Sequence, residues 1–146
     1  MSKTEETVLI MDDEPHVLDW LTEYIEAQGY RVEIVPNVDH AIDALNRSSY
    51  RAAIFDLNVP ATPETLNKIN AKGSLHSQYR GLFAAEHART IGMRGRQVIV
   101  YSVHDNEEIL SRCNTIGAQY LIKARPREFK KALTSLLSYD PSDSSI

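Results

Sequence analysis

Polar residues directly follow four apolar runs in this sequence. Asp12 and Asp13 follow VLIM, Asp56 follows AAIF, Ser102 follows VIVY, and Lys123 follows YLI. Carboxylates of this kind can receive a phosphoryl group or hold a hard divalent cation, and a hydroxyl and an ammonium can bind the oxygens of an anion. That chemistry requires the side chains to lie together, which depends on the elements that carry them.

Apolar runs of strand length alternate with segments of helical period. Strands are predicted at 8–11, 30–35, 52–55, 97–102 and 118–123, and helices at 15–29, 41–45, 82–92, 109–117 and 129–137. Alternating strands and helices with nearly continuous apolar strands imply an α/β fold, a parallel sheet between two layers of helices. Ligands of such sheets bind beyond the carboxyl ends of the strands, where the polar residues above would gather.

Carboxylates that gather there need a counter-charge. Two of them about 4 Å apart repel by about 4 kcal/mol at an effective dielectric near 20. Asp12, Asp13 and Asp56 supply three negative charges, and Mg²⁺ together with Lys123 would supply three positive ones. A site neutralised in this way can admit a phosphoryl group, with an aspartate as its nucleophile and Ser102 as a hydrogen-bond donor to the product.

Each of these residues also has an ordinary structural interpretation. Asp12 and Asp13 could cap the first helix, Asp56 could form a turn, Ser102 could end a strand, and Lys123 could simply be solvated. Their order along a single edge of the predicted sheet favours the chemical interpretation.

The composition is that of one ordinary globular domain. The chain has 146 residues, of which 42% are hydrophobic and 25% charged, and its formal charge of −4 comes without a basic stripe, so direct nucleic-acid binding is not expected. The single cysteine, Cys113, excludes an internal disulfide and is typical of a reducing cytosol. Neither a signal peptide nor a membrane span is recognisable, which predicts a cytoplasmic protein without membrane insertion.

One segment interrupts the alternation of strands and helices. Twenty residues, ATPETLNKINAKGSLHSQYR, separate Pro60 from Gly81, far more than a usual strand-to-helix loop holds. Within it Thr62 can cap a helix, Pro63 suits a first turn and Gly73 can end the helix. The segment is therefore either a short extra helix with a flexible return or an irregular surface loop.

The stretches VLIMDDEP, AAIFDLNVP, VIVYS and GAQYLIK resemble the receiver domain of two-component response regulators, in particular its single-domain, chemotaxis-regulator-like members. The likeness covers roughly residues 7–138. It implies a flavodoxin-like (βα)5 sandwich with strand order 2-1-3-4-5. We therefore divide the chain into a receiver domain, residues 1–140 with an insertion at about 61–80, and a flexible tail, residues 141–146.

The resemblance also implies roles at the carboxylate cluster. Asp56 matches the phosphoacceptor. A sensor histidine kinase or a histidine phosphotransfer protein would transfer the phosphoryl group to it. Asp13 matches a direct ligand of Mg²⁺, and Asp12 its neighbour, which often acts through water. Asn58 matches the position whose backbone carbonyl completes the metal shell.

Three further positions match the parts of the family that respond to phosphorylation. Ser102 matches the switch hydroxyl, Lys123 the lysine that contacts the phosphoryl group, and Tyr120 an aromatic residue that packs inward when the hydroxyl moves. An ordinary strand aromatic is the other interpretation of Tyr120. The fourth helix, fifth strand and fifth helix are expected to form the face that contacts a downstream protein target.

Two local features depart from the family. Val103 stands where receivers usually have a very small residue, and its branched side chain is expected to narrow access to Asp56. Receivers usually have proline directly after the lysine, whereas two residues separate Lys123 from Pro126 here, which predicts a differently shaped loop.

Three functions follow from these observations. The main prediction is a Mg²⁺-dependent phosphoacceptor that switches protein–protein interactions and whose only catalysis is self-phosphorylation and autodephosphorylation of Asp56. Val103 and the displaced proline favour a second, a receiver-like adaptor that binds partners without phosphorylation. The third is a hydrolase of small phosphate esters, against which the lack of a second suitably spaced acid or base weighs.

Overall fold

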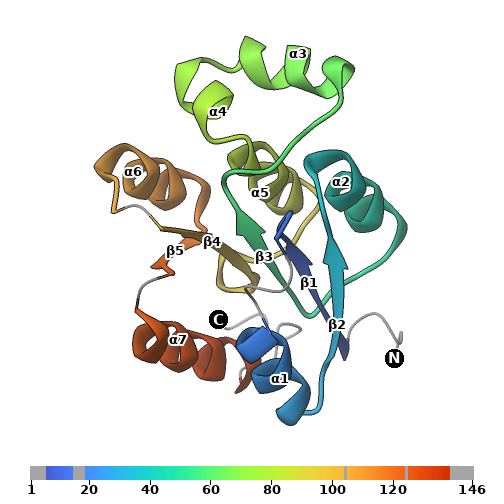
Figure 1. Ribbon diagram of the computed structural model, residues 1–146, viewed down its shortest axis with the longest axis vertical. Helices are drawn as coiled ribbons and strands as arrows, with labels where there is room; N and C mark the ends of the chain where they lie inside the picture. The colour runs from blue at the N-terminus through green and yellow to red at the C-terminus, as the bar shows by residue number, and fades with distance from the viewer. Residues whose placement is uncertain (1–5, 15–18, 104, 124, 139–146) are drawn as a thin grey trace.

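A computed structural model describes residues 6–14, 19–103, 105–123 and 125–138, apart from the side chain of Pro126 (Figure 1). The predicted start of the first helix, the junction after Lys123 and the tail at 141–146 lie outside these residues. Within the described ranges, no helix combines the length and the apolar character that crossing a bilayer requires.

The five strands are parallel and form one sheet in the order β2-β1-β3-β4-β5, which confirms the predicted topology. Their bounds are Thr7–Met11 for β1, Arg31–Val35 for β2, Ala52–Asp56 for β3, Val98–Ser102 for β4 and Gln119–Ile122 for β5. Every residue of β1, β3 and β4 is buried, as expected for central strands covered on both faces.

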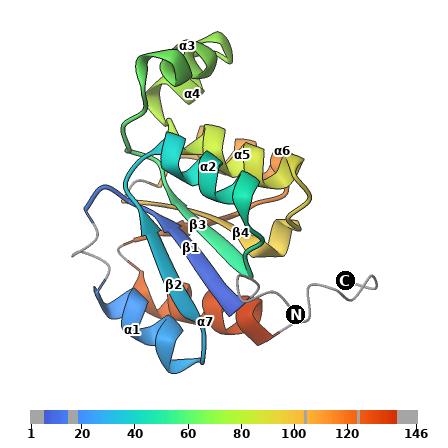
Figure 2. The same cartoon turned by 90° about the vertical axis from the view of Figure 1, so that its right-hand side faces the viewer.

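Helices cover both faces of the sheet, so that the molecule has three layers (Figure 2). Helices α1 and α7 lie on one face, and α2, α5 and α6 lie on the other. Their bounds are Asp19–Ala27 for α1, Val38–Arg47 for α2, Gly81–Thr90 for α5, Glu107–Ile116 for α6 and Pro126–Ser138 for α7. A short 3-10 helix, Gly95–Gln97, leads into β4.

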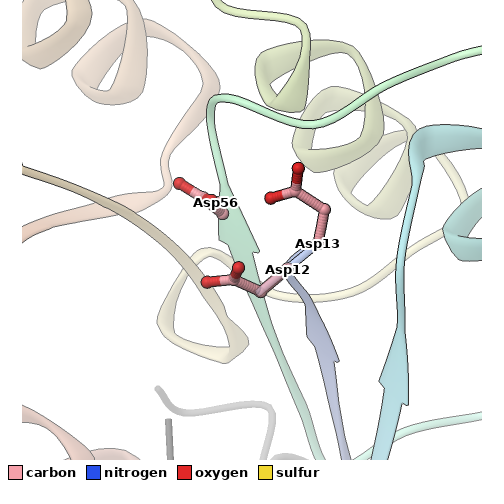
Figure 3. A group of neighbouring side chains, drawn as sticks. All are labelled: Asp12, Asp13 and Asp56. Atoms are coloured by element: carbon pink, nitrogen blue, oxygen red, sulfur yellow. The ribbon is translucent and has the colours of Figure 1, made fainter. Parts of the chain in front are cut away.

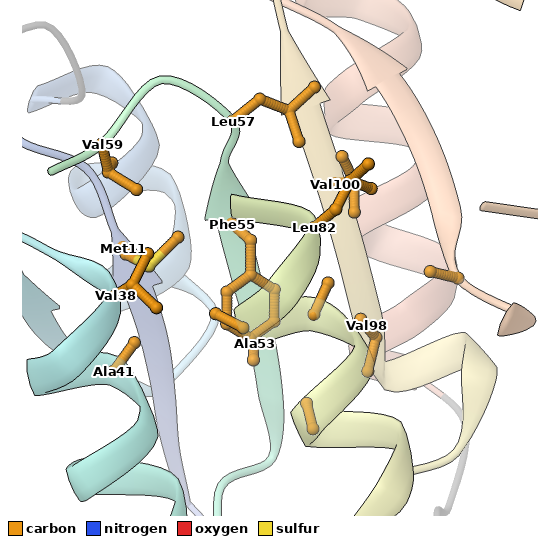
Figure 4. Packing of buried hydrophobic residues seen from close by; sticks show 14 of the residues in the cluster. Met11, Val38, Ala41, Ala53, Phe55, Leu57, Val59, Leu82, Val98 and Val100 are labelled. Carbon is orange, nitrogen blue, oxygen red and sulfur yellow. The ribbon is translucent and has the colours of Figure 1, made fainter. Parts of the chain in front are cut away.

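Alternate residues of each central strand enter opposite cores. Met11, Phe55 and Val100 belong to the core under α2 and α5, together with Leu82 of α5 (Figure 4). Ile10 and Tyr101 belong to the second core, under α1 and α7. Burial on both sides makes the central strands a firm base for the residues at their carboxyl ends.

The inserted segment, residues 61–80, forms two helices beyond the carboxyl ends of the strands (Figures 1 and 2). Helix α3, Pro63–Ala71, begins behind Thr62, whose hydroxyl accepts the N–H of Thr65, so the predicted extra helix and its cap are confirmed. The predicted return contains a second helix, which the sequence did not reveal. It is helix α4, Ser74–Gln78, and His76 on its inner side is buried.

Candidate functional site

Asp12, Asp13 and Asp56 meet at the carboxyl edge of the sheet (Figure 3). One carboxylate oxygen of each lies within 4.8 Å of the other two. Asp12 and Asp56 are buried, whereas Asp13 is exposed. The cluster therefore has two inner carboxylates and one at its solvent side.

Strand register explains why these side chains meet. Strands β1 and β3 are neighbours in which Met11 pairs with Phe55, so the aspartate that follows each residue lies at the same level of the sheet. The Asp12 N–H donates to the Val35 carbonyl oxygen at 3.0 Å and continues the ladder one residue beyond β1. The two aspartates are thus fixed by backbone pairing.

Glycine at position 81 lets α5 begin against the same edge. A Cβ atom there would lie 1.9 Å from the Asp56 carbonyl oxygen, which no side chain tolerates. The Gly81 N–H donates to the Leu57 carbonyl oxygen at 3.1 Å. The first turn of α5 therefore rests directly on the backbone of the candidate acceptor.

Lys123 bridges the two buried carboxylates. Its Nζ lies 3.2 Å from Asp56 Oδ1 and 3.4 Å from Asp12 Oδ2. Its backbone N–H donates to the Ser102 carbonyl oxygen at 2.8 Å, which fixes the residue beside the end of β4. The ammonium is placed to balance charge on either aspartate.

The Asp56 carboxyl is held in a fixed orientation and is harder to ionise than a free aspartate. Burial raises its pKa, Lys123 opposes that shift, and the Asp12 carboxylate adds to it. The N–H of Leu57 donates to Oδ1 at 2.8 Å, and the N–H of Asn58 also donates to the carboxylate. The part of Asn58 that contacts Asp56 is thus its N–H, and its carbonyl as a metal ligand stays a prediction.

Tyr101 belongs to the site although sequence reasoning did not select it. Its hydroxyl donates to Asp12 Oδ2 at 2.5 Å, and its ring centroid lies 4.4 Å from Lys123 Nζ. Burial, followed by the hydrogen bond to Asp12, raises the pKa of Tyr101 far above its usual range, so the hydroxyl remains a donor. The available signal was a tyrosine inside a buried apolar strand, because a buried hydroxyl needs a partner.

Ser102 and Tyr120 contact each other. Ser102 is buried at the end of β4, one position beyond Tyr101, which pairs with Asp56 across the sheet. The Tyr120 hydroxyl is hydrogen-bonded to the Ser102 side chain and accepts the N–H of Asn106 at 3.4 Å. Burial raises the pKa of Tyr120, and these two hydrogen bonds oppose the shift. The half-buried ring packs against the core under α2 and α5, so Tyr120 points inward.

Residues 8–134 match the family model of the response regulator receiver domain. The chain belongs to this family. A comparison with curated protein sequences finds no match.

Solved receiver domains share the fold at low sequence identity. A CheY-like receiver domain protein from Methanospirillum hungatei is 22% identical with a TM-score of 0.66, and the match covers 90% of this chain and 92% of that one. The beryllofluoride-activated receiver of Klebsiella pneumoniae RstA is 16% identical with a TM-score of 0.69, covering 91% and 99%. Thermotoga maritima TrrA, solved with Mg²⁺ and beryllium fluoride, is 21% identical with a TM-score of 0.64, covering 90% and 98%.

The consequences expected from the two departures, Val103 and the displaced proline, both stay predictions. The Val103 side chain is 59% exposed, and its expected narrowing of access to Asp56 stays a prediction. The loop between Lys123 and Pro126 includes residue 124, which lies outside the described residues.

Proposed function

We propose that this receiver domain accepts a phosphoryl group on Asp56 in the cytoplasm and thereby changes which protein it binds. The observation that carries the proposal is the placement of Asp56, a buried carboxylate within 3.2 Å of the Lys123 ammonium and part of a three-carboxylate cluster. A sensor histidine kinase or a histidine phosphotransfer protein would supply the phosphoryl group.

The carboxylate cluster fits a magnesium ion. Three carboxylates whose oxygens lie within 4.8 Å of one another form a hard, negatively charged donor set, which suits Mg²⁺ when waters and a carbonyl complete the shell. Asp12, Asp13 and Asp56 would hold the ion with the carbonyl of Asn58. When bound, Mg²⁺ would neutralise charge on the phosphoryl oxygens.

The residues of the chain have separate parts in the transfer. An Asp56 carboxylate oxygen attacks the phosphorus of a phosphohistidine whose other ring nitrogen is protonated, the P–N bond breaks, and neutral imidazole leaves as an acyl phosphate forms. The N–H groups of Leu57 and Asn58 hold the carboxylate for this attack. Lys123 then balances the charge of the product, since its ammonium already lies beside Asp56.

Ser102 would convert the modification into a change of shape. A hydroxyl donates only one hydrogen bond, so Ser102 can donate to a phosphoryl oxygen only if it does not donate to Tyr120. Tyr120, which already points inward, can then act as the donor to Ser102. Moving such an equilibrium from about 1:99 to about 99:1 needs about 5.5 kcal/mol, which charge-assisted hydrogen bonds and metal contacts can supply. The face of α6, β5 and α7 would present the result to a downstream target.

Intact mass spectrometry tests the acceptor directly. The protein is incubated with Mg²⁺ and acetyl phosphate, beside an Asp56→Asn variant and a sample without metal. We expect a gain of one phosphoryl group that both controls lack. If the mass is unchanged but beryllofluoride with Mg²⁺ shifts the amide resonances, Val103 excludes the small donor. No response to either reagent, with partner binding retained by Asp56→Asn, would replace the proposal by the adaptor.

A further inference from the structure

We propose that Tyr79, at the end of the inserted segment, is a positioning residue for the pair Ser102 and Tyr120, and that it acts through Asn106. The inference rests on the proposed function, because it assigns regulation of that same site to residues 61–80. The inserted segment would thus be a built-in part of the switch.

Asn106 donates a hydrogen bond to each of the two tyrosine hydroxyls, those of Tyr79 and Tyr120. Asn106 donates from its side-chain Nδ2 to the Tyr79 hydroxyl at 3.3 Å and from its backbone N–H to the Tyr120 hydroxyl at 3.4 Å. Gln78 Nε2 also donates to the Tyr79 hydroxyl, at 3.3 Å. Since the Tyr120 hydroxyl is hydrogen-bonded to Ser102, a continuous polar path leads from the inserted segment to the switch hydroxyl.

The orientation of the Asn106 side chain is fixed because this residue also caps α6. Its Oδ1 caps α6 by accepting the N–H groups of Glu108 at 2.8 Å and Ile109 at 3.1 Å. In a planar amide the NH₂ group then faces away from the helix, and this is the side on which Tyr79 stands. Loss of the Tyr79 hydroxyl would leave the NH₂ group without this acceptor and loosen the backbone that holds Tyr120.

Tyr79 itself stands on a well-anchored segment. At the start of α3, Asp39 accepts the Thr62 N–H at 2.8 Å and the Thr62 hydroxyl at 2.9 Å. At α4, the buried His76 contacts Glu86 of α5, and Arg112 of α6 donates from Nε to the same carboxylate at 3.0 Å.

Helix α6 is therefore joined to the inserted segment directly by its N-cap residue Asn106. A second, indirect link runs from Arg112 through Glu86 of α5 to His76. The inward position of Tyr120 depends in part on where this segment docks. By reciprocity, whatever draws Tyr79 away from Asn106 would also disfavour the inward position, and phosphorylation that favours the inward position would tighten the segment.

Fluorine NMR of protein labelled with 3-fluorotyrosine tests the path without any phosphodonor. The Tyr120 resonance is assigned with Tyr120→Phe and compared in wild type, Tyr79→Phe, Asn106→Ser and Tyr50→Phe. Serine keeps a capping oxygen at position 106 but lacks the NH₂ group. Tyr50 is the matched control, because it is also a buried tyrosine but precedes β3, at the amino ends of the strands and so at the end of the sheet away from the site.

We expect the Tyr120 resonance to shift or broaden in Tyr79→Phe and Asn106→Ser and to stay unchanged in Tyr50→Phe. The concentration of beryllofluoride with Mg²⁺ that gives half-saturation should rise about threefold to tenfold in the first two variants, the effect of one lost hydrogen bond. A merely structural role would lower the unfolding midpoint of Tyr79→Phe and leave the Tyr120 resonance in place, which overturns the inference.

The two proposals fail separately. If neither wild type nor any variant responds to beryllofluoride with Mg²⁺, the proposed function is wrong. The fluorine spectra recorded without beryllofluoride still decide the role of Tyr79. If wild type responds and Tyr79→Phe matches it in both measurements, the proposed function stands and the role of Tyr79 is refuted. Circular dichroism confirms that each variant is folded before either measurement.

Discussion

At the scale of single residues, the ionised Asp56 carboxylate lies close to another buried acid. Burial and the Asp12 carboxylate raise its pKa, and Lys123 offsets only part of the shift. A raised pKa in the folded state means that the protonated carboxyl favours folding. This contribution is fully present below the ordinary pKa of 3.8 and is lost as the pH rises through the folded value.

Replacing Asp56 by asparagine is therefore expected to stabilise the metal-free protein at pH 7. A gain of about 1 kcal/mol would raise the unfolding midpoint by about 4 °C for a domain of this size. The advantage over wild type should narrow as the pH is lowered from 7 toward 4, because wild-type Asp56 then becomes protonated. Thermal unfolding in buffer with a chelator measures both effects. A variant less stable than wild type at pH 7 would mean that the Lys123 pair outweighs burial.

At the scale of elements, one carboxylate joins three helices. Glu86 of α5 accepts from Arg112 of α6 and contacts His76 of α4. Although burial acts in the opposite direction, the hydrogen bonds from Arg112 and His76 hold the pKa of Glu86 below its ordinary value. The stability that this carboxylate provides is present above the ordinary pKa of 4.5 and is lost as the pH falls through the lower folded value.

Glu86→Gln is expected to cost about 2 kcal/mol of unfolding free energy at pH 7, typical for hydrogen bonds to a charged group. The difference from wild type should shrink as the pH falls from about 4.5 through the lower folded value, because the carboxyl is protonated first in the unfolded chain. Urea unfolding at pH 7 and at a pH below 4.5 measures the difference in unfolding free energy. Glu108→Gln is the matched control, since Glu108 is exposed on α6 and should change stability by less than about 0.5 kcal/mol. Equal curves for Glu86→Gln and its control at pH 7 would contradict the joint role.

At the scale of the whole molecule, the stability of the fold should respond to Mg²⁺. A ligand that binds only the folded state stabilises it by about 2.7 kcal/mol at a free concentration of 100 times its Kd. We expect Mg²⁺ to raise the unfolding midpoint of wild type, and Asp13→Asn to reduce the gain, because Asp13 is the exposed member of the cluster. Glu14→Gln is the control, as an exposed neighbouring acid outside the cluster. Equal gains in all three proteins would place the ion elsewhere.

The sequence predicted what depends on local pattern and missed what depends on distant pairs. Buried parallel strands need apolar residues on both faces, so VLIM, AAIF and VIVY revealed β1, β3 and β4. The aspartates of the cluster and Ser102 directly follow these runs. Helix α4 has five residues, too few for a helical period to show. The contacts of Glu86 join residues 10 and 26 positions away, and no local pattern indicates them.

Backbone hydrogen bonds on both sides of residues 61–80 have a consequence for protein engineering. The Pro60 carbonyl accepts the N–H of Val38 at 3.1 Å, and the Gly81 N–H donates to the Leu57 carbonyl at 3.1 Å. Because both junctions are fixed to the body of the protein, residues inserted at Lys72 and Gly73, the exposed turn between α3 and α4, would leave the register of the sheet and the contacts of Tyr79 in place. Doubling the length of such a loop costs only about 0.6 kcal/mol in closure entropy. This turn is therefore a suitable site for grafting a foreign peptide, whose ligand would then bind on the segment that contacts Asn106 through Tyr79.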